Sequence, residues 1–267
     1  MSKLLIISGS HPRHLFVHNT IKNLFDDVLI LLMERENLIP ETPDGLLDID
    51  RSNFIRHFSE RNQVEKRAYG DLDDSIFEGH NVFKCTRKTL NSFTTASKVS
   101  EFNPDICFIF GPAIIKKPLF EQLPEFKFNL HLGLSPTYKG SATLFWPFFM
   151  LEPQFAGVTF HQISNKADAG DIIHQQCPIL YEEDGIHDVA ARCVTDAAIT
   201  AYEILSIFLR QKSLQTTQQR SSGKLWLSTD FHPYHLRLVY NTFDNDIVFH
   251  YLNGSLSDSK PDLIKLI

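Results

Sequence analysis

Several short apolar runs, each followed by a polar or glycine-containing loop and then by a helical pattern, limit the fold of this chain more than any other feature. Residues 4–7 (LLII) form such a run, and residues 8–13 and a helical stretch at 14–25 follow it. Residues 104–111 contain turn residues, an apolar run and then a glycine. Apolar runs without polar alternation are typical of strands buried on both faces. We therefore expect an α/β fold with a doubly wound, mostly parallel sheet flanked by helices.

The remaining elements follow the same alternation. Further strands are predicted at residues 28–33, 82–85, 127–131, 157–162 and 172–179, and further helices at 51–67, 89–102, 116–123, 143–151 and 185–211. Residues 212–223 are polar and are interpreted as a linker, and residues 224–267 form a small C-terminal extension. Residues 1–211 are therefore expected to form the main domain.

Composition narrows the class of protein. The chain has 267 residues, a formal charge of −6 and a pI near 6.0, which argues against broad nucleic-acid binding because such binding usually leaves a basic surface. Its four cysteines are widely separated and form no CxxC pair, as expected for free thiols in a reducing cytosol. The first apolar run is too short for a signal peptide, and no run approaches a membrane span. We expect a cytoplasmic protein without a membrane partner.

The stretch from 126 to 172 concentrates the residues suited to chemistry. Asn129 and His131 lie two residues apart at the end of a predicted strand, so their side chains share one face. A loop with two glycines and a proline follows at 132–141, and two acids, Asp168 and Asp171, occur in a predicted turn. An amide, an imidazole and a carboxylate together suggest acyl transfer, because they can stabilise an oxyanion and move a proton.

Four strings in this stretch resemble the formyltransferases that use N10-formyltetrahydrofolate. They are NLH at 129–131, LSPTYKG at 134–140, GVTFH at 157–161 and DAGDI at 168–172, and both order and spacing match. The resemblance covers roughly residues 4–208. It implies a formyltransferase catalytic domain at 1–211, with Asn129, His131 and Asp168 as catalytic residues. Asp171 remains an alternative to Asp168, and whether His131 acts as a base or as a charged support for the oxyanion stays open.

The resemblance also implies two sets of binding residues and no metal. The folate co-substrate is expected to contact Phe110, Gly111, Ile114, Ile115, Asp168 and Gly170. The acceptor substrate is expected to contact Ser10, His11, Arg13, Ser135, Lys139 and Trp146. Simpler interpretations stay open for several of these residues: a surface loop at 10–13, a solvated Lys139, and core packing for Trp146. His161 is expected to be a pocket residue rather than a zinc ligand, because no ligand set has metal spacing.

The acceptor is expected to be a nucleotide-linked amino sugar, such as a dTDP- or GDP-activated amino-deoxyhexose used for surface polysaccharide. The loop at 132–136 looks like the version found in sugar-nucleotide N-formyltransferases. The extension of about 45 residues is also too short for the large tRNA-binding domain of methionyl-tRNA formyltransferase. Another amine acceptor, such as glycinamide ribonucleotide, an amino acid derivative or methionyl-tRNA, is one alternative. A folate-binding protein without catalysis is another. Sugar-nucleotide enzymes of this kind imply a homodimer.

Overall fold

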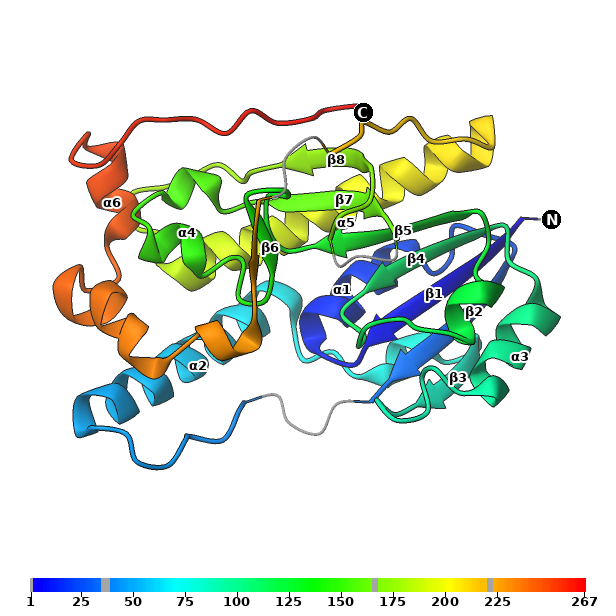
Figure 1. The fold of residues 1–267 in the computed structure, drawn as a ribbon, viewed down its shortest axis with the longest axis horizontal. Coiled ribbons are helices and arrows are strands. Elements are labelled where there is room, and N and C mark those ends of the chain that lie inside the picture. The colour runs from blue at the N-terminus through cyan, green and yellow to red at the C-terminus, as the bar shows by residue number, and fades with distance from the viewer. Residues whose placement is uncertain (1, 35–38, 165–167, 220–222) are drawn as a thin grey trace.

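A seven-stranded sheet forms the centre of the computed structural model, which describes residues 2–34, 39–164, 168–219 and 223–267 (Figure 1). The strand order is β3-β2-β1-β4-β5-β7-β8. The strands are β1 (Lys3–Gly9), β2 (Asp27–Met33), β3 (Asn81–Cys85), β4 (Ile106–Phe110), β5 (Phe126–His131), β7 (Val158–Gln162) and β8 (Ile172–Gln176). The first five are parallel, whereas β7 and β8 are antiparallel to their neighbours. The expected mostly parallel sheet is confirmed.

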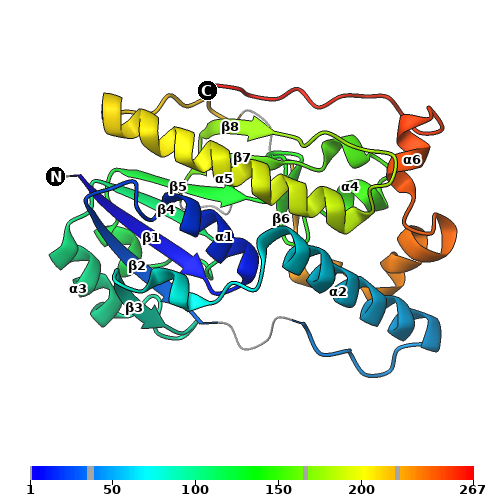
Figure 2. The ribbon, with the colours of Figure 1, turned by 180° about the vertical axis from the view of Figure 1, so that it is seen from behind.

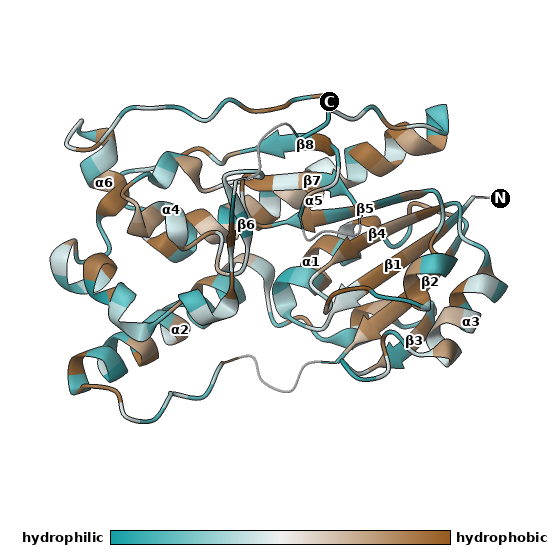
Figure 3. Cartoon of the chain, in the orientation of Figure 1, coloured by the Kyte–Doolittle hydropathy of each residue, from teal (hydrophilic) through white to brown (hydrophobic). Residues whose placement is uncertain are grey.

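Helices cover both faces of this sheet. The helices α1 (Pro12–Ile21) and α5 (Ile186–Gln211) lie on one face (Figure 2), and α3 (Phe93–Phe102) and the 3₁₀ helix η2 (Leu119–Gln122) lie on the other. Successive side chains of a strand point to opposite faces, so Leu4 and Ile6 of β1 join the core under α1 and α5. Leu5 and Ile7 join the core under α3. Both faces need apolar side chains, which explains the absence of polar alternation and the apolar strands of Figure 3.

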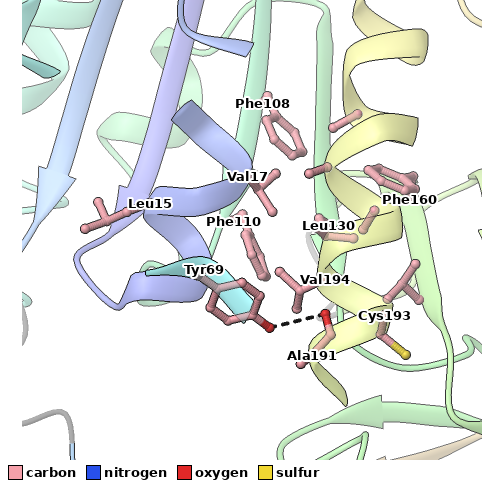
Figure 4. Close-up of a cluster of buried hydrophobic side chains, with 14 of the residues drawn as sticks. Leu15, Val17, Tyr69, Phe108, Phe110, Leu130, Phe160, Ala191, Cys193 and Val194 are labelled. Carbon is pink, nitrogen blue, oxygen red and sulfur yellow. Dashed lines mark hydrogen bonds between the residues drawn. The ribbon is translucent and has the colours of Figure 1, made fainter. Parts of the chain in front are cut away.

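The core between the sheet and α5 is rich in aromatic side chains. Phe108 of β4 and Phe160 of β7 face Val194 of α5 in this cluster (Figure 4). The hydroxyl of Tyr69, the last residue of α2 (Asp48–Tyr69), donates to the carbonyl of Ala191 at 3.4 Å. The long helix α2 is thereby fastened to α5 at the end that lies nearest the sheet.

The centre of the sheet has a topological switch, because the chain leaves β1 towards β2 on one side and later adds β4 on the other. The imidazole of His14 fills the space between the ends of β1 and β4. A Cβ atom on Gly9 would lie 2.6 Å from His14 Nδ1, and one on Gly111 would lie 2.2 Å from the ring. Gly111 also has a φ of +85°, which favours glycine. In open α/β sheets, ligands bind in the crevice at the carboxyl ends of strands beside such a switch.

The C-terminal segment is built into this fold. Strand β9 (Lys224–Trp226) pairs in parallel with β6 (Tyr138–Gly140) in a second sheet. Thr217 bridges to Ile172, and Lys265 bridges to His174, so both segments cover the edge strand β8. The boundaries at 211 and 223 remain predictions; Thr217 of the predicted linker contacts β8, and β9 and Lys265 of the predicted extension make the other contacts. The remaining elements are η1 (Asp74–Phe77), α4 (Trp146–Phe149), η3 (Pro153–Phe155), η4 (Ser228–Asp230), η5 (Pro233–His235), the π-helix η6 (Leu238–Thr242) and α6 (Ile247–Leu252).

Several predicted elements are shorter than expected. The strand predicted at 172–179 ends at Gln176, because Pro178 has no N–H with which to continue the ladder. The helix predicted at 143–151 is reduced to the four residues of α4. The helix predicted at 116–123 is a single 3₁₀ turn. Within the described part of the chain, no helix is both long and apolar enough to cross a bilayer.

Candidate active site

Asn129 and His131 lie at the carboxyl end of β5, and the antiparallel strand β7 decides what faces them. Asn129 is paired with His161 across the two strands, and His131 is paired with Thr159. Directly opposed residues of antiparallel strands put their side chains on the same face. The Nδ2 atom of Asn129 accordingly lies 3.4 Å from Nε2 of His161. The antiparallel pairing of β5 with β7 therefore places a second histidine, His161, beside Asn129 and His131.

The hydrogen bonds of His131 determine which of its ring nitrogens can accept a proton. Its Nε2 lies 2.8 Å from the carbonyl oxygen of Tyr138, and a carbonyl only accepts, so Nε2 carries a hydrogen. Gly133 makes this approach possible, because a Cβ there would lie 2.7 Å from the same nitrogen. The other nitrogen, Nδ1, faces Oδ2 of Asp168 at 3.6 Å. A proton taken up by neutral His131 therefore goes to Nδ1, beside the carboxylate.

Asp168 connects the two histidines. Its Oδ1 lies 3.4 Å from Nε2 of His161, and its Oδ2 accepts a hydrogen bond from the backbone N–H of Gly140 at 2.9 Å. Burial alone would raise the pKa of Asp168, but the contact with His161, the charge of each imidazole when it is protonated, and the Gly140 amide lower it to about 2. Asp168 is therefore a carboxylate at neutral pH.

Burial has the larger effect on His131. It lowers the pKa of His131, while the Asp168 carboxylate and the bond to the Tyr138 carbonyl act in the opposite direction. The imidazole is thus neutral at pH 7 and able to accept a proton. Asp168 then stabilises the imidazolium that forms. Asn129, His131, Asp168 and His161 together make a site that can accept a proton and donate an amide N–H at adjacent positions.

The loop after His131 is held by buried polar side chains. Thr159 Oγ1 accepts from the N–H of Ser135 at 2.9 Å and donates to the carbonyl of Gly133 at 2.7 Å. Gln175 of β8 donates to the Ser135 carbonyl at 2.6 Å. Ser135 is 2% exposed: its backbone anchors the loop and its side chain is buried, while its contact with the acceptor stays a prediction.

Trp146 is buried in the same way. Its side chain is 1% exposed, and its ring stacks on Trp226 with the centroids 4.0 Å apart. Its Nε1–H donates to the carbonyl of Ser141 at 3.0 Å. This arrangement favours the core-packing interpretation of Trp146, and its contact with substrate stays a prediction. Lys139 lies on β6 and is buried as well, opposite Leu225 of β9.

The predicted anion-binding loop at 10–13 meets an unpredicted acid. Ser10 and His11 follow β1, and Arg13 lies in the first turn of α1. Glu65 of α2 pairs with the Arg13 guanidinium, and its Oε2 lies 3.4 Å from His11 Nδ1. Burial raises the pKa of Glu65, although the charges of Arg13 and Arg61 lower it. Arg13 and His11 from the loop region and Arg61 from α2 thus surround the carboxylate of Glu65.

The residues predicted to hold folate lie at the end of β4. Phe110 is buried in the core, and Gly111 ends the strand. Ile114 is 70% exposed, and its carbonyl accepts from Nδ2 of Asn91 at 3.0 Å. Ile115 packs against the core under α3. The loop after β4 is therefore fixed in position while one apolar side chain points to solvent.

The turn that carries Asp168 is tightly packed. A Cβ on Gly170 would lie 1.8 Å from the carbonyl oxygen of Gln162, so only glycine fits there. The carbonyl of Asp171, the alternative acid, accepts from the N–H of Gln162 at 2.8 Å. Asp168, and not Asp171, is the acid that contacts the histidines.

Sequence reasoning missed several neighbours of the site. The motif GVTFH contained His161, but the pairing of β5 with β7 was needed to place it against Asn129. Gly140 and Gln219 contact Asp168 from 28 and 51 residues away in the chain, and no local pattern indicated them. Within the described ranges, no group of three or more His, Cys, Asp or Glu side chains could hold a metal ion.

Comparison with known proteins places this site in a family. The model of the formyl transferase family matches residues 55–203. A solved N-formyltransferase from Helicobacter canadensis, in complex with folinic acid and dTDP-3-aminofucose, is 20% identical, with a TM-score of 0.56 over 87% of this chain and 73% of that one. A likely sugar N-formyltransferase from Mycobacterium tuberculosis is 18% identical, with a TM-score of 0.55 over 86% of this chain and 77% of that one.

A phosphoribosylglycinamide formyltransferase from Anaplasma phagocytophilum has a similar fold. It is 15% identical, with a TM-score of 0.55 over 85% of this chain and 98% of that one. At these identities, the structural likeness shows the fold and leaves the acceptor open. The family match extends over more than half of the 267 residues and includes the strand that carries Asn129 and His131 and the turn that carries Asp168. The protein therefore belongs to the formyl transferase family.

Proposed function

We propose that this protein transfers a formyl group from N10-formyltetrahydrofolate to the primary amine of a nucleotide-linked amino sugar. The observation that carries the transfer chemistry is the contact of Asp168 with both His131 and His161, beside the amide of Asn129. The exposed apolar side chain of Ile114, at the end of β4, suits an aromatic folate. The donor supplies the formyl carbon that the amine attacks.

The side chains then have separate tasks. Nδ1 of His131 takes the proton that the amine loses, since Nε2 is engaged by Tyr138. The carboxylate of Asp168 faces that nitrogen and stabilises the charge. Asn129 has two N–H groups on Nδ2: one suits His161, and the other can donate to the developing oxyanion. The N–C bond to the acceptor forms, the bond from the formyl carbon to N10 breaks, and the proton passes to the tetrahydrofolate nitrogen.

The acceptor class rests on charge and on the relatives. Arg13 and Arg61 place positive charge around Glu65 near the end of β1, and this charge supports a phosphorylated acceptor. The solved enzyme from Helicobacter canadensis was crystallised with dTDP-3-aminofucose, and one from Anoxybacillus kamchatkensis with a UDP-linked formamido sugar and tetrahydrofolate. Glycinamide ribonucleotide is a second candidate, because the Anaplasma phagocytophilum enzyme aligns over 98% of its length. A cytoplasmic location and a homodimer stay predictions.

An acceptor screen tests the proposal. The purified protein is incubated with N10-formyltetrahydrofolate and one acceptor at a time: dTDP-, GDP- and UDP-linked 3- and 4-amino sugars, glycinamide ribonucleotide, or methionyl-tRNA. Folate absorbance reports donor turnover, and mass spectrometry reports the product. We expect one amino sugar to gain a formyl group, and we expect this gain to disappear in the Asp168→Asn variant.

The outcomes separate the alternatives. Formylation of glycinamide ribonucleotide alone would replace the acceptor while retaining the chemistry. Binding of folate without turnover on any acceptor would contradict the proposed transfer and support a binding protein. Turnover that survives both His131→Asn and Asp168→Asn would contradict the assigned roles.

A further inference from the structure

Gln219 reaches back to the turn that carries Asp168. Its Nε2 donates to the carbonyl oxygen of Asp168 at 3.1 Å and to that of Gly170 at 2.6 Å. Gln219 lies in the stretch that the sequence indicated as a linker, two residues after Thr217, which bridges to β8. One side-chain amide thus satisfies two backbone acceptors about 50 residues away.

The backbone at this turn needs such support. Asp168 has a φ of +47°, in the left-handed region that non-glycine residues rarely adopt. A conformation of this kind persists only where its surroundings enforce it. The two hydrogen bonds of Gln219 fasten both ends of the short segment from Asp168 to Gly170, so they determine where the carboxylate points.

The donor atom, and not the acceptor, is the useful half of this amide. Oε1 of Gln219 is buried and has no hydrogen-bond partner among the described residues, whereas Nε2 has two. Leaving the buried Oε1 unpaired is unfavourable, and the two hydrogen bonds made by Nε2 offset this cost. A side chain without an N–H at this position cannot replace it.

A second contact from the same segment ends at the same carboxylate. Strand β9 pairs with β6, and the N–H of Gly140 at the end of β6 donates to Asp168 Oδ2. The C-terminal segment therefore holds the backbone of Asp168 through Gln219 and supports its side chain through β6. Both contacts converge on the residue whose carboxylate faces His131.

We propose that Gln219 is a positioning residue that holds Asp168 against His131 and His161. This inference rests on the proposed formyl transfer for its kinetic part, but its geometric part does not require turnover. A mutation that displaces a reacting group by about 1 Å can lower the rate by roughly 10- to 100-fold. Gln219→Leu should therefore lower kcat by that factor and leave the KM for folate nearly unchanged.

The experiment compares Gln219→Leu with Gln218→Leu, since Gln218 is the exposed neighbour on the same segment. Histidine resonances are titrated by NMR in the wild type, both variants and Asp168→Asn. Because the Asp168 carboxylate raises the pKa of His131, Gln219→Leu should lower that pKa in the same direction as Asp168→Asn. Gln218→Leu should match the wild type in both the titration and kcat.

An unchanged His131 pKa and kcat in folded Gln219→Leu would overturn the inference. Equal losses in both variants would also overturn it, since they would indicate a general effect of the segment. If Gln219→Leu does not fold, Gln219→Met keeps the length of the side chain, adds no charge and removes the donor, and it is held to the same criteria. The titration is independent of turnover, so a wild-type protein that formylates nothing would disprove the proposed function while this inference could still stand.

Discussion

Two largely buried carboxylates lie among basic side chains, and although burial raises the pKa of both, their pKa values shift in opposite directions. Asp168 lies between two histidines and has its pKa lowered to about 2, whereas Glu65 lies between two arginines and has its pKa raised. Formal charge does not explain the difference, because the arginines carry the stronger charge. Asp168 accepts the N–H of Gly140 and contacts both His161 and His131, and these interactions together outweigh its desolvation. For Glu65, desolvation is the larger effect.

The difference indicates separate roles. A carboxylate that stays ionised can support a histidine that gains a proton during catalysis. A carboxylate that is costly to ionise, yet pairs with Arg13, balances charge where a substrate phosphate could compete for the same arginine. We therefore interpret Asp168 as part of the reacting group and Glu65 as a partner of the acceptor subsite.

We expect the largest difference between the two acids in kcat, measured on variants that neutralise each of them. Asp168→Asn removes the charge that faces His131 Nδ1 and should lower kcat by roughly 10²- to 10⁴-fold, the usual contribution of acid–base assistance. Glu65→Gln, which contacts none of Asn129, His131 and Asp168 directly, should mainly alter the KM for the acceptor. Steady-state kinetics on the acceptor identified by the screen measure both. Similar kcat losses in the two variants would remove the distinction.

The free energy of unfolding at acid pH should show the effect of the lowered pKa of Asp168. Its folded pKa lies below the value of 3.8 for an unperturbed aspartate, so its ionised form stabilises the fold above pH 3.8, and this contribution is lost as the pH falls towards 2. The shift corresponds to about 2 kcal/mol. Urea unfolding should thus show a gap between wild type and Asp168→Asn that is present at pH 6 and narrows below pH 4. A gap that stays constant with pH would contradict the lowered pKa.

Glu65 should show the opposite and smaller dependence. Its folded pKa is raised above 4.5, so the folded state holds the proton longer than the unfolded state does. The wild type should therefore lose stability relative to Glu65→Gln as the pH rises from 4.5 through the folded pKa. The same unfolding series measures this trend. A wild type that gains stability relative to the variant over this range would show that the pair with Arg13 outweighs burial.

The sequence could predict the strands of the sheet, because each buried strand is a local apolar run. It could also predict that Asn129 and His131 share a face, since that follows from the repeat of a strand. The family resemblance supplied Asp168. The sequence alone could not predict that His161 lies opposite Asn129, because the antiparallel register of β5 and β7 depends on two separate segments. Trp146 was ambiguous for a similar reason, since its partner Trp226 lies 80 residues later.

What the sequence by itself determined is the local chemistry: which segments are apolar on both faces, where glycine is needed, and which side chains end β5. Only the tertiary structure decided the partners. It paired Glu65 of α2 with Arg13, turned β7 so that His161 meets Asp168, and brought Gln219 back to the turn of Asp168. The physical reason is that a pKa or a hydrogen bond depends on atoms within a few ångströms. Segments far apart in this chain supply most of those atoms.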